Sequence, residues 1–330
     1  MTFNTTKPNQ IKENHSQRNP IFFDFSVENI INNSDKEIEG LKSFLEFRSK
    51  INSKSKALKF HRGTINAIVA RQGAGKSTLP FNLAVDFIKQ GKKVLFLTLE
   101  ETREVVSNKM LALMAYKLGY ELPKKLPEDM ETMNEYIQWQ AKATKRGQFD
   151  GLPSLIDQSI KDLKTGLRVA FVEPSLAKIK KLILEEHEQS PFDIVFIDYF
   201  QLLEGEASQN SWDSSLVNAG VLKELAVKNN IIIVTGSQAN RASVQGANKN
   251  IGTESISGGD GLANVCNVII HIEREEDKKT HEPLDTSIIK IIKDRDSQLG
   301  INSTIKVTMI DNQIKIPIPR AGVELIKITK

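Results

Sequence analysis

The segment from Ala67 to Thr78 constrains the fold more than any other part of the chain. It reads Ala-Ile-Val-Ala-Arg-Gln-Gly-Ala-Gly-Lys-Ser-Thr, an apolar run followed by a glycine-containing turn and the start of a helical pattern. A strand, a tight loop and a helix N-terminus in this order direct backbone N–H groups and the positive end of the helix dipole at one anion. The segment therefore predicts a phosphate-binding loop within an α/β fold.

The residues of this loop have distinct expected roles. Gly73 and Gly75 let the backbone approach the phosphates, Lys76 supplies a positive charge, and the Ser77 hydroxyl can ligate magnesium. Ala70 stands where the strict pattern has its first glycine. The alternative is a small-residue turn with an ordinary surface lysine. We expect nucleotide binding by the whole loop, which consists of Ala70, Arg71, Gln72, Gly73, Ala74, Gly75, Lys76, Ser77 and Thr78.

Size and charge leave the class of partner open. The chain has 330 residues, which fits one large α/β domain with extensions. The formal net charge is only +4. A nucleic-acid channel lined by a few loops need not change that total, so the charge neither supports nor excludes such a partner.

Several features predict a cytoplasmic protein that does not span a membrane. The single cysteine, Cys266, sits in an apolar run and cannot form an intrachain disulfide, which fits a reducing compartment. Residues 1–19 are polar and lack the apolar core of a signal peptide. Apolar runs elsewhere are shorter than the roughly 18 residues that a membrane-spanning helix needs.

The N-terminal part is expected to precede the catalytic core. Residues 1–20 predict a disordered tail, and residues 21–55 a docking segment with a linker helix. The apolar patch Ile21-Phe-Phe-Asp-Phe docks either on the main body or on a neighbouring subunit. Apolar residues at helical spacing predict the helix over 35–51, which packs either on its own domain or on the next protomer.

Residues 56–330 show the alternation of an α/β ATPase domain. Apolar runs alternating with helical patterns predict a mostly parallel sheet with helices on both faces. Later strands separated by short turns, at 287–293 and 303–316, predict an antiparallel C-terminal edge. Residues 119–165 read as a charged helical insertion at the rim. The expected core strands are 64–70, 93–99, 167–172, 192–198, 230–236 and 264–272, and the expected core helices are 76–90, 102–118, 175–188 and 214–228.

Polar residues that end these strands should converge on the phosphate loop, because ligands of parallel sheets gather at the carboxyl ends of the strands. Asp198 closes one strand and is expected to hold magnesium opposite Ser77. Glu100 closes another and is expected to polarise a water for attack on the γ-phosphate. Glu101 is the competitor, and its side chain should point to the other face.

Two further groups of residues are candidates for nucleotide sensing. Gln238, just beyond a strand, can contact both the γ-phosphate and the following loop, as a switch between nucleotide states. Lys293 and Arg295 lie at alternate positions of a strand and should face the same way. Cations supplied from an adjacent subunit accelerate phosphoryl transfer. The alternatives are an ordinary polar turn and a solvated, salt-bridged strand end.

Together these segments resemble the RecA-type core of the DnaB-family replicative helicases, which are hexameric ring ATPases. The resemblance covers about residues 55–318, and alanine at the first loop position is familiar in that family. The matching pieces are Ala70-Arg-Gln-Gly-Ala-Gly-Lys-Ser, Leu97-Thr-Leu-Glu, Val172-Glu-Pro, Ile197-Asp-Tyr-Phe-Gln-Leu-Leu, Gly236-Ser-Gln-Ala-Asn-Arg and Lys293-Asp-Arg.

The resemblance implies a RecA-like P-loop NTPase that uses ATP and Mg²⁺ and forms a homo-oligomeric ring, expected to be a hexamer. In this family the residue matching Glu100 activates water, and the cations matching Lys293 and Arg295 reach the neighbouring subunit's nucleotide. Loops matching 205–214 and 242–257 grip single-stranded DNA, for which Arg241 and Lys249 are the clearest cations here. A replication partner protein is also implied.

Full-length members of this family carry a large N-terminal domain, and roughly 55 residues before the core are too few for it. We therefore expect a stand-alone core like those of plasmid, phage or mobile-element helicases, translocating on single-stranded DNA at the expense of ATP. Two alternatives stay open. One is a RecA-like ATPase that remodels a protein partner or acts in recombination. The other is a nucleotide-gated scaffold that assembles without turnover.

Overall fold

The computed structural model describes residues 37–39, 47–48, 55–56, 59–121, 133–148, 153–203, 211–239, 256, 260–277, 279–280, 282–295, 304–310 and 313–315. The chain divides into two compact units, residues 1–36 and residues 37–330. All the elements below belong to the second unit. The predicted tail at 1–20, the apolar patch at Ile21–Phe25 and the candidate DNA-binding residues Arg241 and Lys249 lie outside the described residues.

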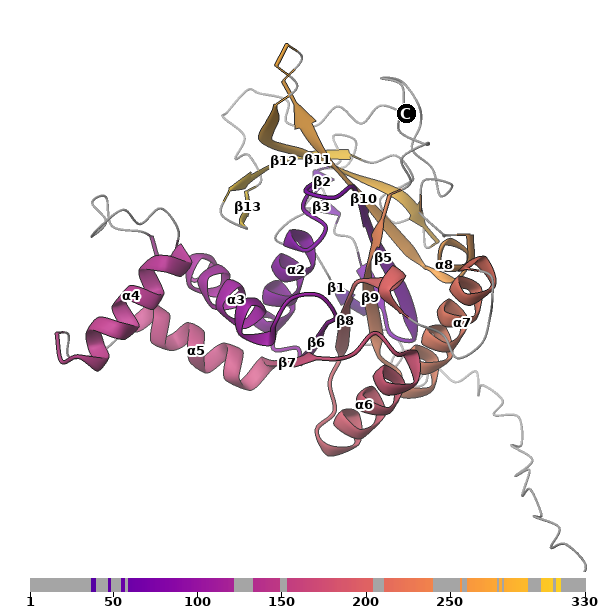
Figure 1. Cartoon of the computed structure of the whole chain (residues 1–330), viewed down its shortest axis with the longest axis horizontal. Coiled ribbons are helices and arrows are strands. Elements are labelled where there is room, and N and C mark those ends of the chain that lie inside the picture. Colours follow the sequence, from indigo (N-terminus) through magenta and orange to yellow (C-terminus); the bar gives the residue numbers. More distant parts are fainter. Residues whose placement is uncertain are drawn as a thin grey trace, which may run out of the picture. The chain divides into compact units, whose positions relative to one another are not determined.

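A mixed sheet organises this unit (Figure 1). Its described strands follow the order β13-β12-β11-β10-β5-β9-β8-β6-β7. The neighbours from β10 to β7 are parallel, whereas β11, β12 and β13 add antiparallel pairs at one edge. Both the parallel centre and the antiparallel C-terminal edge confirm the predicted fold. The strands are β5 (Thr64–Ala70), β6 (Val94–Thr98), β7 (Leu167–Phe171), β8 (Ile194–Asp198), β9 (Ile232–Gln238), β10 (Val268–Glu276), β11 (Pro283–Asp294), β12 (Thr304–Ile310) and β13 (Gln313–Lys315).

Helices cover both faces of the sheet, as its doubly buried strands require. On one face, α2 (Thr78–Lys89) and α3 (Arg103–Lys117) bury their apolar side chains against the strands. Phe96 and Phe196 from adjacent strands stack at the centre of this layer, with ring centroids 5.5 Å apart. On the other face lie α6 (Leu176–Gln189), α7 (Ser211–Asn229) and α8 (Asp260–Val265). A short 3₁₀ turn, η1 (Phe200–Leu202), follows β8.

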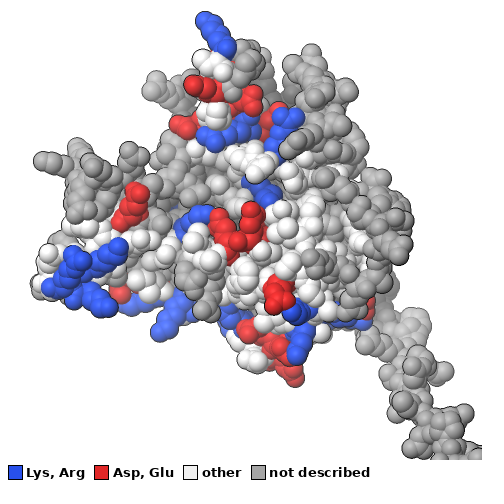
Figure 2. Space-filling view, in the orientation of Figure 1, with Lys and Arg blue, Asp and Glu red and all other residues white. Residues whose placement is uncertain are grey.

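The predicted charged segment at 119–165 contains two helices, α4 (Met133–Lys145) and α5 (Ser154–Gly166). Both pack on α3, and they share a small apolar cluster that includes Ala115, Ile137 and Ile156. Figure 2 shows red and blue side chains interspersed over this face of the molecule, with basic side chains grouped at the end of these helices. This helical lobe thus has its own small core beside the main one.

Within the segment 35–51, for which a helix was predicted, the described residues form short strands. β1 (Glu37–Glu39) pairs with β4 (Lys59–His61), and β2 (Phe47–Arg48) pairs with β3 (Ser55–Lys56). The helix prediction is therefore wrong at 37–39 and 47–48. The alternation Glu-Ile-Glu at 37–39 suits a strand as well as a helix, and antiparallel partners decide between them. Among the helices that the structure describes, none is long and apolar enough to cross a membrane.

Two strand boundaries also differ from the predicted ones. β9 extends to Gln238, so this residue ends a strand instead of lying in the following loop. The strand predicted at 264–272 begins at Val268, because Asn264 and Val265 belong to α8. The N–H of Asn267 donates to the carbonyl of Ile65 at 2.8 Å, which starts the pairing of β10 with β5.

Candidate nucleotide-binding site

The phosphate loop, residues 70–78, has the backbone geometry that its sequence predicts. Gly73 and Gly75 have φ of +77° and +97°, which a residue with a side chain rarely adopts. The N–H of Ala74 bonds to the carbonyl of Arg71 at 3.1 Å and closes the turn. A Cβ atom on Gly75 would also lie 2.8 Å from the Met309 sulfur. The second glycine is therefore favoured by its φ, and a side chain there would also displace the end of the Met309 side chain.

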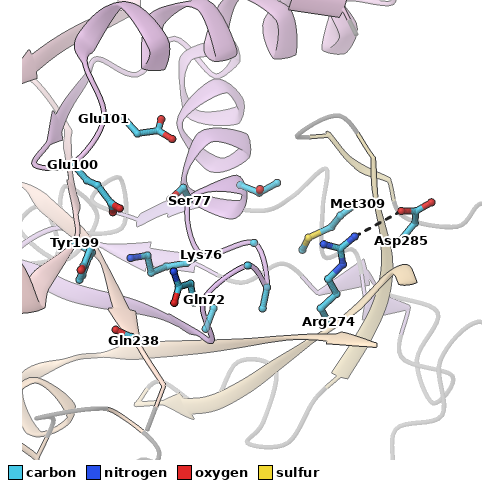
Figure 3. Close-up of a pocket in the computed structure, with 15 residues that line it drawn as sticks. Gln72, Lys76, Ser77, Glu100, Glu101, Tyr199, Gln238, Arg274, Asp285 and Met309 are labelled. Atoms are coloured by element: carbon cyan, nitrogen blue, oxygen red, sulfur yellow. Dashed lines mark ion pairs between the residues drawn. The ribbon is translucent and has the colours of Figure 1, made fainter. Parts of the chain in front are cut away.

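The loop borders a cavity of about 640 Å³ (Figure 3). Most of the phosphate loop lines this cavity, together with the predicted residues Glu100 and Gln238. Arg71 lines a neighbouring cavity of about 730 Å³ instead. The lining residues are Ala70, Gln72, Gly73, Ala74, Gly75, Lys76, Ser77, Thr78, Glu100, Glu101, Tyr199, Gln238, Arg274, Asp285 and Met309.

Asp198 ends β8 beside the loop and is 7% exposed. Its carboxylate accepts a hydrogen bond from the Ser77 hydroxyl, while its Oδ1 is buried and has no partner among the described residues. Burial raises the pKa of this carboxyl, and the charge of Lys76 and the Ser77 hydrogen bond oppose that rise. A hydroxyl and a carboxylate oxygen that needs a partner fit a Mg²⁺ ion, which takes few protein ligands and completes its shell with water and phosphate. The described residues contain no cluster of three or more His, Cys, Asp or Glu side chains that could hold a metal ion.

Lys76 is held by an aromatic ring that the sequence interpretation did not include. Its Nζ lies 3.1 Å from the centre of the Tyr199 ring, which follows Asp198 across a cis peptide bond. Burial lowers the pKa of Lys76, and the negative charges of Asp198 and Glu100 counteract this. Figure 3 shows the ammonium group extended toward Tyr199. The Tyr199 ring therefore orients the loop's positive charge within the cavity.

Glu100 and Glu101 both line the cavity, so the expectation that Glu101 points to the other face is wrong. They follow β6 in a turn, where the alternation of a strand no longer applies. Glu101 forms an ion pair with Lys109 of α3, with 2.5 Å between Nζ and Oε1. Glu100 is exposed, and its carboxylate forms no ion pair with any described residue. Glu100 is thus the carboxylate available to a ligand.

The end of β9 is tied to the turn that follows β8. The Gln201 side chain donates to the Ser237 hydroxyl at 2.6 Å and accepts from the Gln238 N–H at 3.2 Å. This pair of bonds sets the backbone position from which Gln238 reaches the cavity. Gln201 was not among the predicted site residues, although it lies inside the matching piece that begins at Ile197.

The other end of the cavity is formed by the antiparallel edge. Arg274 of β10 forms an ion pair with Asp285 of β11 at 3.8 Å, and its Nε donates to the Leu284 carbonyl at 2.7 Å. Met309 of β12 lies beside them (Figure 3). No local sequence pattern marks these three residues, because only the strand pairing brings them to the loop.

Lys293 and Arg295 do not reach this cavity. Lys293 donates to the Ala263 carbonyl at 2.5 Å, and Arg295 donates to the Asn264 carbonyl, both at the C-terminal end of α8. The Arg295 N–H bonds to the Asn267 carbonyl, level with the start of β5, whereas the phosphate loop follows its end. Five residues of strand at about 3.3 Å each separate these levels by roughly 16 Å. The two cations therefore face the same way but lie far from their own subunit's phosphate loop.

Comparison with known proteins agrees with this geometry. The family model for the DnaB-like helicase C-terminal domain matches residues 53–315. The fold resembles a DnaB-like replicative helicase, solved with its interactions with primase, at 17% identity and a TM-score of 0.58, over 77% of this chain and 57% of that one. It also resembles the ATPase domain of G40P at 17% identity and a TM-score of 0.62, over 88% of this chain and 96% of that one.

The chain thus spans 57% of the length of that replicative helicase. No curated protein matches the sequence. At 17% identity the two structures support the fold alone. The family model covers most of the chain, including the phosphate loop, Glu100, Asp198 and the Lys293–Arg295 segment. The chain belongs to the family of DnaB-like helicase C-terminal domains.

Proposed function

We propose that the chain is an ATP-hydrolysing motor that assembles into a ring, translocates on single-stranded DNA and unwinds duplex DNA. The observation that carries this proposal is the convergence of Lys76, Ser77 and Glu100 on one cavity at the carboxyl ends of the strands, with the Asp198 carboxylate hydrogen-bonded to Ser77 beside it. A phosphate loop with a magnesium-compatible carboxylate, and a second carboxylate that forms no ion pair with a described residue, can together hydrolyse a nucleoside triphosphate.

The phosphate loop would hold the β- and γ-phosphates of ATP. Its backbone N–H groups and the α2 N-terminus attract the phosphate oxygens, and Lys76 adds a charge. Ser77 and Asp198 would hold Mg²⁺, which neutralises charge on the β- and γ-phosphate oxygens. Arg274, Asp285 and Met309 would border the nucleoside, because they line the end of the cavity away from Lys76.

Glu100 would orient the attacking water and accept its proton. Its exposed carboxylate lies close enough to raise the pKa of both Lys76 and Asp198. Glu101 would not share this role, because Lys109 holds its carboxylate. Gln238 would transmit the nucleotide state to the segment that follows β9, since Gln201 fixes its backbone and leaves its side chain at the cavity.

In a ring of subunits, Lys293 and Arg295 would contact the nucleotide of the neighbouring subunit. Their distance from their own phosphate loop supports a role at a nucleotide held by another subunit. We propose a homo-oligomer, with six subunits by analogy with the hexameric ring ATPases that the sequence resembles. The DNA contacts proposed for Arg241 and Lys249, a replication partner protein, the cytoplasmic location and an origin in a phage or other mobile element rest on that analogy.

A comparison of two adjacent glutamates tests the hydrolysis mechanism. Glu100→Gln should lower kcat of ATP hydrolysis at least about 100-fold and leave ATP binding intact, because it removes the proton acceptor but keeps the shape. Glu101→Gln is the matched control and should retain most of the activity. Similar losses in both variants would contradict the assignment of Glu100.

The DNA motor is tested with the unmodified chain. ATP hydrolysis should rise on addition of oligo(dT) at low salt, and the mass of the particle with ATP should be a multiple of the chain mass. Oligo(dT) stimulation would be absent if the chain were a remodelling ATPase that acts on a protein partner. Assembly on ATP without any hydrolysis would instead indicate a nucleotide-gated scaffold.

A further inference from the structure

Three basic side chains gather around the buried thiol of Cys266: Lys223 of α7, Lys293 of β11 and Arg295 just after it. All three are close enough to influence the ionisation of this thiol. Burial raises the pKa of Cys266 to about 12, so the thiol stays neutral and supplies no compensating charge. We call these three side chains the cation cluster.

Neutral carbonyl oxygens hold the cation cluster in place. Lys223 donates to the Gly63 carbonyl at 2.9 Å, at the turn before β5. Lys293 and Arg295 donate to the carbonyls of Ala263 and Asn264. In the described part of the chain, no carboxylate forms an ion pair with any of the three.

Two neighbouring cations, unlike the cation cluster, form ion pairs with carboxylates of the same subunit. Lys228, one turn further along α7 from Glu224, forms an ion pair with it. Arg62, next to Gly63, forms an ion pair with Asp193. A partly buried group of like charges without a counter-ion is unfavourable by itself. The contrast indicates that the cation cluster is suited to an anion that this subunit does not supply.

The electrostatics agree with that interpretation. Burial lowers the pKa of Lys223 and of Lys293, and the charge of Arg295 lowers each further. A lysine has three N–H donors and an arginine five, so each member keeps donors beyond its carbonyl bonds. An anion with several oxygens could accept these donors and remove the mutual repulsion.

We propose that Lys223 is a third cation which, beside Lys293 and Arg295, contacts the terminal phosphates of a nucleotide held by a second copy of this chain. The proposal rests on the ring-forming ATPase function and adds a residue that no sequence motif indicated. The subunit's own nucleotide is excluded by the roughly 16 Å that separate the cluster's level from the end of β5. A compact group around one thiol suits a polyphosphate end better than a nucleic-acid backbone, which needs an extended track of contacts.

Mixing of variants tests the contribution in trans. Lys223→Met should lower ATP hydrolysis about tenfold or more, as should Arg295→Ala. Adding inactive Lys76→Ala chains to either variant should restore activity, because they supply an intact cluster to the intact phosphate loop of the variant. Lys223→Arg, which keeps the charge, should retain activity. Lys228→Met, on the same helix but paired with Glu224, is the matched control and should behave like the unmodified chain.

The outcomes separate the two proposals. If Arg295→Ala is not rescued by Lys76→Ala chains, the role in trans that belongs to the proposed function is wrong. If Arg295→Ala is rescued but Lys223→Met is fully active, the assignment of Lys223 is wrong. If Lys223→Met loses activity and the Lys76→Ala chains do not restore it, Lys223 acts inside its own subunit and the inference is overturned.

A binding measurement examines the site without turnover. In the Lys76→Ala chain, inorganic tripolyphosphate should still bind, and adding Lys223→Met should weaken that binding about tenfold while adding Lys228→Met should not. Equal binding by both double variants would overturn the inference. If adding Lys223→Met instead weakened oligo(dT) binding about tenfold and left tripolyphosphate binding unchanged, the cluster would bind nucleic acid and the inference would be wrong.

Discussion

The ammonium group of Lys76 lies 3.1 Å above the centre of the Tyr199 ring, so the phosphate loop and the turn after β8 share a direct contact. The negative face of an aromatic ring attracts a cation and partly replaces the water that burial removes. Tyr199 also directly follows Asp198, the proposed magnesium ligand. One turn therefore positions both the charge of the phosphate loop and the carboxylate opposite it.

The face of Tyr199, and not its hydroxyl, should matter for catalysis. Tyr199→Phe keeps the ring and should leave kcat/KM for ATP nearly unchanged. Tyr199→Leu removes a contact of about 0.5–2 kcal/mol and should lower kcat/KM roughly 2- to 30-fold. Steady-state ATP hydrolysis measures both variants. Equal activity of the Phe and Leu variants would show that the ring does not hold Lys76.

A methyl group at Gly236 should disturb the same turn from the opposite side. A Cβ atom there would lie 3.1 Å from Asp198 Oδ1 and 3.2 Å from Tyr199 Cβ. Gly236→Ala should therefore lower ATP hydrolysis about tenfold or more, because displacement of catalytic groups is costly. The control is Gly220→Ala in α7, where nothing lies within 4 Å of the added carbon.

That control should raise the free energy of unfolding by about 0.5–1 kcal/mol, because alanine favours a helix interior over glycine. Its ATP hydrolysis should stay normal. Retention of full activity by Gly236→Ala would mean that β9 can move away from the Asp198 turn.

His271 should make the fold sensitive to acid. Burial lowers its pKa from 6.5 to about 4, with further effects of the Lys290 and Arg71 charges, and its Nε2 has no hydrogen-bond partner among the described residues. Between these pH values the unfolded chain binds a proton that the folded chain does not. Stability is therefore unaffected by this group above about pH 6.5 and falls as the pH decreases toward 4.

The predicted slope from His271 is at most about 1.4 kcal/mol per pH unit. Urea unfolding from pH 7 to pH 4 should show a shallower loss of stability in His271→Leu than in the unmodified chain. Parallel pH profiles for the two proteins would exclude His271 as the source of acid sensitivity.

The ion pair between Asp86 of α2 and Lys117 of α3 should make the stability costs of changing these two residues strongly non-additive. The Nζ and Oδ1 atoms are 2.5 Å apart, and the side chains are 5% and 10% exposed for Asp86 and Lys117. Lys117→Met should cost about 3 kcal/mol, because it leaves a buried carboxylate without its cation. Asp86→Leu with Lys117→Met should cost much less than the sum of the two single changes. A double-mutant cycle by chemical denaturation measures this coupling, and additive costs would contradict it.

Much of the site could be predicted from the sequence because each predicted residue lies next to a strand end. The order of apolar runs and helical patterns establishes a parallel sheet, and parallel strands bring their carboxyl ends to one edge. For this reason Glu100, Asp198 and Gln238 could be connected to the phosphate loop without any knowledge of side-chain distances. The prediction of a linker helix over 35–51 was wrong at the residues described there. Such short segments fit both the helical and the strand periodicity, and the pairing with partner strands selects the strand.

Tertiary structure alone decided what lies across from these residues. Glu101 faces the cavity because of a turn that follows the strand, and Lys109 holds it there. Arg274 and Met309 come from antiparallel strands late in the chain and meet the phosphate loop only through sheet pairing. Lys223 joins Lys293 and Arg295 because α7 packs across the start of β5.

The sequence by itself determined the phosphate loop, the parallel sheet and the residues that end its strands, because backbone periodicity and loop chemistry act over short stretches of chain. Only the tertiary structure decided that Lys76 lies on Tyr199, that Met309 approaches Gly75, and that three cations gather around Cys266. These contacts join residues that are distant in the sequence, and their distances depend on strand order and helix packing, which no local pattern specifies.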